Sequence, residues 1–240
     1  MKDINHQQKD IEQFYDEYVQ RQLKHGVNKR HHSILNKLKE AGLKNNHKVL
    51  EVGCGIGTFT GLLIKEVVHG KVVAMDISGA SVKYASDNNP YKNLKFVHAD
   101  AANHDFGNQK FDVVVLPDVL EHIPIELHRQ LFKKLSDVLN DGGFIFIHIP
   151  NPYYLKWCHE NRPDLLQVID QPITTDILVE NTNCNNLYID RLKTYSIWVT
   201  HGDYQVIVLR KNGWQDFKQN EEKKVNLISK IKYKLNALRK

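Results

Sequence analysis

The fold of this chain is decided by the stretch Val49-Leu50-Glu51-Val52-Gly53-Cys54-Gly55-Ile56-Gly57-Thr58 and by a second run, Val72-Val73-Ala74-Met75-Asp76. Each is an apolar run with an acid at or near its end, and the first opens into three closely spaced glycines. This order predicts a strand, a glycine loop, a helix and a second parallel strand with an acid at its tip. Glycines let the backbone approach a ligand closely, and the acid can accept hydrogen bonds from both ribose hydroxyls. The unit therefore predicts a nucleoside site.

The spacing of the glycines separates two classes of nucleoside-binding protein. The dinucleotide fingerprint G-x-G-x-x-G fails in both registers, because Thr58 or Thr60 stands at the third glycine position. The pattern E-x-G-x-G-x-G instead resembles motif I of the class I S-adenosylmethionine-dependent methyltransferases.

Three further segments resemble motifs of that family and follow in the family's order. Residues 95–101 form a short predicted strand that ends in Asp-Ala, similar to the adenine-binding motif. Residues 111–118 lead into Val119-Leu120-Glu121-His122-Ile123, which is similar to motif IV of the small-molecule branch. Residues 139–147 match the L-x-P-G-G turn into the fifth strand, with Asp141 where proline is common.

The resemblance covers residues 47–151 densely and extends more loosely to about residue 211. It implies an α/β fold with a Rossmann-like seven-stranded sheet, parallel except for one strand, with helices on both faces. The alternation of strand and helix patterns over 48–148 independently predicts a parallel sheet. Predicted strands near 187–194 and 204–210 would supply the antiparallel pair.

The chain is expected to divide into three parts. Residues 1–46 contain two predicted amphipathic helices, over about 7–24 and 28–41, and are expected to cap the cleft. Residues 47–217 are expected to form the methyltransferase domain, with a substrate-binding insertion at about 151–186.

The third part, residues 218–240, holds the excess positive charge. It carries eight lysines and arginines against two glutamates, a net of +6, so the rest of the chain sums to −1. Its apolar stripe comprises Val225, Ile228, Ile231, Leu235 and Leu238. A basic amphipathic helix of this kind is typical of a segment that lies on an anionic membrane, over residues 222–240. A solubilising or partner-bound helix fits the same pattern.

The composition is that of an ordinary globular domain, with 41% hydrophobic and 25% charged residues among 240. No apolar stretch approaches the roughly 20 residues that span a bilayer. Residues 1–10 are polar and lack a signal-peptide core. The three cysteines are widely spaced and show no metal-ligand spacing. We expect a cytoplasmic protein, in part membrane-associated, with free thiols and no metal site.

The resemblance implies S-adenosylmethionine as the cofactor. Glu51 would support the glycine loop and the methionine ammonium, Asp76 would bind the ribose hydroxyls, and Asp100 would accept from the adenine amino group. Ile77 would pack on the adenine face, and the carbonyl of Pro117 would face the ammonium. The full implied cofactor set is Glu51, Gly53, Cys54, Gly55, Gly57, Thr58, Asp76, Ile77, Asp100, Ala101, Pro117 and Asp118. Helix capping is the other interpretation of Asp76 and Asp100, and simple packing is that of Cys54.

Methyl transfer needs alignment of the acceptor and, for some acceptors, a general base. The candidates for catalysis are His122 after motif IV, His148 at the end of the fifth strand, and Asp118. Glu121 is interpreted as either structural or functional. Arg30, His31 and His32 can reach the cofactor carboxylate from the cap. The predicted acceptor pocket contains the aromatic residues Tyr15, Tyr18, Tyr153, Tyr154 and Trp157.

The acceptor class follows by exclusion. No N-P-P-Y follows the fourth strand, where Leu116-Pro117-Asp118-Val119 stands, and no Pro-Cys nucleophile occurs. These absences argue against DNA and protein amide acceptors. An oxygen or nitrogen of a small molecule remains, with a saccharide or a lipid-linked intermediate as the candidates. An RNA- or protein-directed methyltransferase anchored by the basic tail and a non-catalytic S-adenosylmethionine-binding protein are the alternatives.

Overall fold

The computed structural model describes residues 22–213. Tyr15, Tyr18, most of the helix predicted over 7–24 and the basic segment 218–240 lie outside the described residues.

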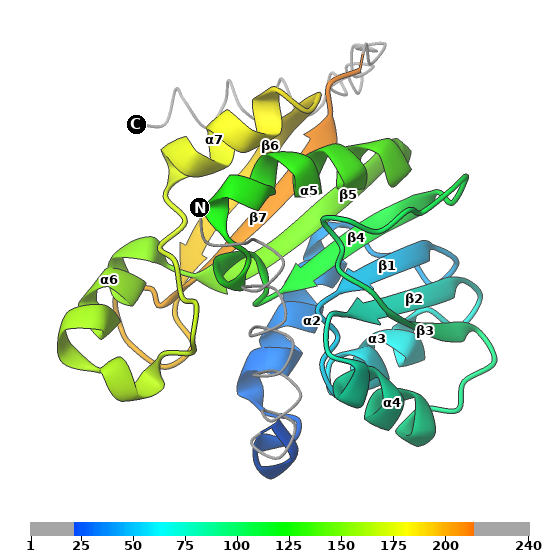
Figure 1. Ribbon diagram of the computed structural model, residues 1–240, viewed down its shortest axis with the longest axis horizontal. Helices are drawn as coiled ribbons and strands as arrows, with labels where there is room; N and C mark the ends of the chain where they lie inside the picture. The colour runs from blue at the N-terminus through cyan, green and yellow to red at the C-terminus, as the bar shows by residue number, and fades with distance from the viewer. Residues whose placement is uncertain (1–21, 214–240) are drawn as a thin grey trace, which may run out of the picture.

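One seven-stranded sheet, in the order β3-β2-β1-β4-β5-β7-β6, forms the centre of the molecule (Figure 1). β7 runs antiparallel to both of its neighbours, and the pairs from β3 to β5 are parallel, as predicted. The strands are β1 (Lys48–Val52), β2 (Lys71–Asp76), β3 (Leu94–His98), β4 (Phe111–Pro117), β5 (Leu139–Pro150), β6 (Leu187–Tyr195) and β7 (Tyr204–Lys211).

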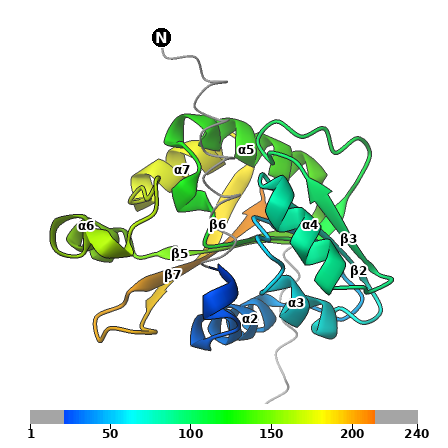
Figure 2. The same ribbon diagram turned by 60° about the horizontal axis from the view of Figure 1, so that its bottom comes forward.

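Helices cover both faces of this sheet (Figure 2). α2 and α3 pack on one face, α5 and α7 pack on the other, and α4 contacts β2 and β3. The helices are α2 (Lys29–Ala41), α3 (Thr60–Glu66), α4 (Gly79–Asn88), α5 (Ile125–Val138), α6 (Pro152–Asn161) and α7 (Thr175–Asn183), with 3-10 turns η1 (Leu120–His122) and η2 (Pro163–Leu165). No helix within residues 22–213 is long and apolar enough to cross a bilayer.

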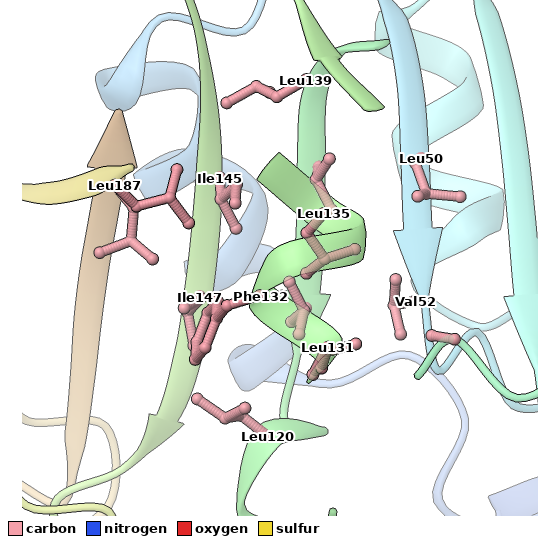
Figure 3. Packing of buried hydrophobic residues seen from close by; sticks show 14 of the residues in the cluster. Leu50, Val52, Leu120, Leu131, Phe132, Leu135, Leu139, Ile145, Ile147 and Leu187 are labelled. Atoms are coloured by element: carbon pink, nitrogen blue, oxygen red, sulfur yellow. The ribbon is translucent and has the colours of Figure 1, made fainter. Parts of the chain in front are cut away.

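The core is double because successive residues of a strand point to opposite faces. In β4, Val113 and Val115 join the cluster under α2 and α3, while Val114 and Leu116 join the cluster under α5. Figure 3 shows Phe132 of α5 and its neighbours packed onto the second face. A strand buried on both faces is almost entirely apolar, and the sequence predicts these strands for that reason.

Both ends of α2 are specified by local chemistry. The Asn28 side chain accepts a hydrogen bond from the Arg30 N–H at 3.0 Å, and the ring of His31 accepts from the Asn28 N–H at 3.2 Å. Gly42 ends the helix with a φ of 115°, a conformation that suits glycine. The helix therefore begins and ends where the sequence predicts, and Arg30 and His31 fall in its first turn.

Candidate active site

The glycine loop and the acid of β2 are joined by hydrogen bonds. The Gly55 N–H donates to Asp76 Oδ2 at 2.7 Å, and the Ser78 N–H donates to Asp76 Oδ1 at 2.9 Å. Burial raises the pKa of Asp76, while these backbone donors oppose the rise. Asp76 thus orders the loop itself.

A cavity of about 540 Å³ lies at the carboxyl ends of β1, β2, β4 and β5. The strand order reverses between β1 and β4, and open α/β sheets bind ligands at such a switch point. The volume falls within the range of small-molecule sites. All of the predicted cofactor residues except Gly57 line this cavity.

Glu51 is the most unusual side chain of the nucleoside wall. It is fully buried, and neither carboxyl oxygen forms a hydrogen bond of good geometry with a described residue, although the Thr60 hydroxyl lies near enough to favour the ionised form. Burial raises its pKa to about 8. Because burying a polar group without a partner is unfavourable, the site suits a ligand that brings a cationic donor.

Asp118 lies at the centre of a hydrogen-bonded chain beside the cavity. Arg30 Nη1 lies 2.5 Å from Asp118 Oδ2, and His148 Nδ1 bonds the other carboxyl oxygen. His148 Nε2 accepts from the Tyr195 hydroxyl at 2.6 Å, and the Tyr204 ring stacks on the imidazole at 4.7 Å. Burial alone would raise the pKa of Asp118, but Arg30 and His148 outweigh it and lower the pKa to about 2. Asp118 is therefore ionised and paired.

His122 faces the cavity from η1, and protein groups engage both ring nitrogens. Nδ1 lies 2.5 Å from the Ile169 carbonyl oxygen and 3.3 Å from Asp170 Oδ1. Nε2 lies 3.1 Å from the Gln167 amide nitrogen. With Nδ1 donating to the carbonyl, Nε2 accepts from Gln167. The segment between α6 and α7 thus orients this ring.

Residues 49–143 match the family model of a methyltransferase domain. This stretch of the chain is therefore a methyltransferase domain, and its fold is that of the class I S-adenosylmethionine-dependent methyltransferases.

Relatives and solved structures agree with that family. Demethylmenaquinone methyltransferase of Staphylococcus saprophyticus is 34% identical over 110 residues, 45% of this chain and 46% of that protein. Malonyl-(acyl-carrier protein) O-methyltransferase 1 of Ilyobacter polytropus is 30% identical over 149 residues, 60% of this chain and 54% of that protein. The chain thus spans about half the length of these curated relatives. A TehB-like methyltransferase structure from Corynebacterium glutamicum, at 18% identity, shares the fold with a TM-score of 0.60 over 82% of this chain and 97% of that one.

The residues of this methyltransferase domain fit S-adenosylmethionine as the cofactor. The orphaned carboxyl of Glu51 matches the methionine ammonium of S-adenosylmethionine, and Asp76 has its carboxyl at the cavity wall for ribose hydroxyls. Asp100 lines the cavity, and its Oδ1 accepts from the Ala102 N–H at 2.9 Å. This bond closes a turn over residues 101–103, and no helix begins there, so the helix-cap alternative is wrong for Asp100.

Gly57 is the one residue of the predicted cofactor set that does not line the cavity. A Cβ at this position would lie 2.8 Å from Asn89 Nδ2 and 3.1 Å from Ala85 Cβ. Gly57 therefore lets the loop approach α4, and its prediction as a cavity residue is corrected to a packing role.

The structure also relocates several residues predicted for the acceptor side. Tyr154 lines the cavity, whereas Tyr153 is 74% exposed and Trp157 is 49% exposed, and neither lines it. His148 is fully buried behind Asp118 and does not line it either. His148 is thus corrected from a group that meets the acceptor to one that holds Asp118. His31 lines the cavity, whereas His32 is exposed.

Other acceptor-side residues were missed by sequence reasoning. Gln167, Asp170, Trp198 and Tyr204 line the cavity. The first two fall in the irregular segment before α7, and the others lie at the β6–β7 hairpin. No motif marks them, since their place depends on how these segments fold back over β5.

Proposed function

We propose that this methyltransferase moves the methyl group of S-adenosylmethionine to an oxygen or nitrogen atom of a small molecule. The observation that carries the proposal is a single cavity. It is lined by the predicted nucleoside-binding acids Glu51 and Asp76 and also by Asp118, Glu121 and His122, which follow β4. The names of the curated relatives, which include a demethylmenaquinone methyltransferase and a malonyl-(acyl-carrier protein) O-methyltransferase, support a small acceptor group.

The chain's own residues would mainly bind and align. The cofactor supplies a methyl group already activated by a positive sulfur. Glu51 would pair with its ammonium and Asp76 would accept from its ribose hydroxyls, while Arg30 keeps Asp118 ionised beside the acceptor. Alignment of this kind can supply on the order of 7–11 kcal/mol. Cavity walls also exclude water from the reacting atoms.

The proposal extends to the division of the chain. Residues 1–46 would act as the cap, 47–217 as the methyltransferase domain, and 151–186 as the acceptor-binding insertion. The cavity lining supports the last part, because Tyr154, Leu155, Leu166 and Gln167 belong to this insertion. Their mixture of apolar and polar groups would suit an amphipathic acceptor such as a saccharide or a lipid-linked intermediate.

The first experiment is calorimetric titration with S-adenosylmethionine and S-adenosylhomocysteine. We expect binding in the micromolar range, which Asp76→Ala abolishes. The surface control Asp87→Ala should preserve it, because Asp87 is exposed and pairs with Lys83 on the outer side of α4. S-adenosylhomocysteine release with a panel of saccharides, amines and alcohols then identifies the acceptor. Folded wild-type protein that binds neither cofactor form would refute the proposal.

We also propose that residues 222–240 contact anionic membranes, because the +6 charge of residues 218–240 flanks an apolar stripe. Deletion of 218–240 should remove binding to phosphatidylglycerol vesicles at low salt. Equal binding with and without these residues would exclude the tail as the membrane contact.

A further inference from the structure

Glu121 is a second buried carboxyl group in the cavity, and no motif role accounts for it. It lies on η1, directly after the carboxyl end of β4, and is only 2% exposed. It lines the cavity, and its Oε2 has no hydrogen-bond partner among residues 22–213. Its Oε1 lies 3.8 Å from His122 Nε2, beyond hydrogen-bond distance.

The three residues that the sequence nominates for catalysis are already engaged by the protein. Asp118 is bonded by Arg30 and His148, and both nitrogens of His122 have partners. His148 lies behind Asp118 and bonds Tyr195. Glu121 is thus the acceptor-side carboxyl with an oxygen left for a ligand, among the residues that the structure describes.

A carboxyl group in this setting favours a particular kind of ligand. Burial, and next the neighbouring charge of Asp118, raises the pKa of Glu121 well above its usual range. A ligand that donates an O–H or N–H bond would satisfy the orphaned oxygen. An anionic ligand would instead face the ionised carboxylate of Asp118 beside Glu121, and like charges at close range are repelled.

We propose that Glu121 accepts the O–H or N–H hydrogen bond of the methyl acceptor and takes its proton, so that the acceptor group is a hydroxyl or an amine and not a carboxylate or phosphate. This inference rests on the proposed methyl transfer. In the step, the acceptor oxygen or nitrogen forms a bond to the methyl carbon while the carbon–sulfur bond breaks and its electrons stay on sulfur. The acceptor's proton goes to Glu121 Oε2. The positive charge on sulfur and the negative charge on the carboxylate therefore disappear together.

The test uses the full chain saturated with S-adenosylhomocysteine, which permits binding without turnover. Benzylamine, benzyl alcohol and benzoate serve as probes because they share a ring and differ in the polar group. We expect the amine and the alcohol to bind and benzoate not to bind. Glu121→Gln should weaken benzylamine by at least about tenfold, since a hydrogen bond between charged groups is lost. If Glu121→Gln lowers the affinity for benzylamine more than that for benzyl alcohol, the natural acceptor group is assigned as an amine. If it lowers both affinities equally, the acceptor group is assigned as a hydroxyl.

Two variants control this experiment. Glu126→Gln makes the same change at an exposed position of α5 outside the cavity, and it should leave all three affinities unchanged. Glu121→Asp keeps the carboxyl group and should keep the preference for amine over benzoate. Thermal melting of each variant confirms folding.

The inference is overturned if benzoate binds as tightly as benzylamine, if Glu121→Gln leaves benzylamine binding unchanged, or if none of the probes binds. Failure of the proposed function is seen separately, because S-adenosylhomocysteine would then not bind in the preceding titration.

Discussion

At the scale of single residues, the cavity shows how environment sets the state of a carboxyl group. Glu51 and Glu121 are buried without partners in the described structure, and burial raises the pKa of each. Asp118 is also buried, yet Arg30 and His148 lower its pKa. Opposite shifts within one cavity are typical of functional sites, where acid and base roles must be kept apart.

The raised pKa of Glu51 predicts a pH-dependent affinity for S-adenosylmethionine. The carboxyl group must lose its proton to pair with the ammonium, and the ionised fraction increases as the pH rises towards about 8. Affinity should therefore increase by up to about tenfold per pH unit below that value and level off above it. Calorimetric titration at several pH values measures this slope. Glu51→Gln should bind more weakly with no such slope, whereas a flat wild-type profile would contradict the role of Glu51.

Gly53 predicts a steric requirement in the loop. Its φ is 75°, and an added Cβ would lie 2.2 Å from Val119 Cγ2. Gly53→Ala should lose about 1–2 kcal/mol from the left-handed backbone alone, with the clash in addition. Urea unfolding measures the loss of stability. Adding Val119→Ala to the Gly53→Ala variant should relieve the clash and restore that part of the stability, while the backbone strain remains. A Gly53→Ala variant as stable as the wild type would contradict this geometry.

At the scale of elements, α2, β4 and β5 meet at one buried ion pair. The Asp118 N–H donates to the His148 carbonyl oxygen at 2.8 Å, which continues the β4–β5 pairing to the edge of the cavity. Arg30 reaches the same carboxylate from the first turn of α2. The cap helix is thus attached to the sheet at the site itself, and the fold and the site depend on each other there.

Breaking this pair should be costly. Arg30→Met removes one of the two partners of Asp118. Losing one member of a buried ion pair destabilises a protein by roughly 3 kcal/mol. We expect somewhat less here, since the Arg30 side chain is 31% exposed. In urea unfolding, Arg30→Met combined with Asp118→Asn should lose less than the sum of the single changes. Lys39→Met removes the exposed pair with Glu66 on the same helix and should cost less than about 1 kcal/mol. Equal losses of stability for these two ion pairs of α2 would contradict the proposed difference between them.

At the scale of the whole molecule, the sheet converts sequence order into one functional edge. Parallel strands place the ends of β1, β2 and β4 together, so that Glu51, Asp76 and Asp118 meet although they are far apart in the chain. The double core beneath them is densely apolar. The unpaired carboxyl groups at the edge reduce stability in the absence of a ligand, which such functional sites commonly do.

This arrangement predicts the pH dependence of the free protein's stability. A carboxyl group whose pKa is raised on folding contributes stability at low pH, and this contribution is lost as the pH rises through the folded value. Glu51, Asp76 and Glu121 all act in this direction. His31 has the opposite influence, because its pKa is lowered to about 4 on folding and stability therefore increases as the pH rises from that value. This increase ends above the pKa of a histidine in the unfolded chain, about 6.5.

The melting temperature of the ligand-free protein should therefore fall between about pH 6.5 and 8. Glu51→Gln should reduce that slope, and scanning calorimetry measures both. A melting temperature that rises across this window would contradict the proposed burial of these carboxyl groups. Saturation with S-adenosylmethionine should raise the melting temperature at every pH in this window.

The sequence by itself determined the succession of strands and helices along the chain and the residues of the nucleoside wall. The strands β1 and β4 are mostly apolar because both of their faces are buried. Asn28 and Gly42 mark the ends of α2 through local hydrogen bonds and φ. Glu51, Gly53 and Asp76 lie in or beside the elements that place them, so their spacing along the chain carries most of the information.

Only the tertiary structure decided the acceptor wall. Arg30, Asp118, His148 and Tyr195 form one chain of contacts across 165 residues of sequence, and no local pattern encodes such pairing. Tyr153 and Tyr154 are adjacent, yet the packing of α6 exposes one and turns the other to the cavity. Glu121 and His122 are likewise neighbours, and the fold bonds both nitrogens of the histidine while leaving the glutamate an open oxygen. Side-chain direction and partnership depend on how distant segments pack, and therefore the sequence could nominate the site but not assign its roles.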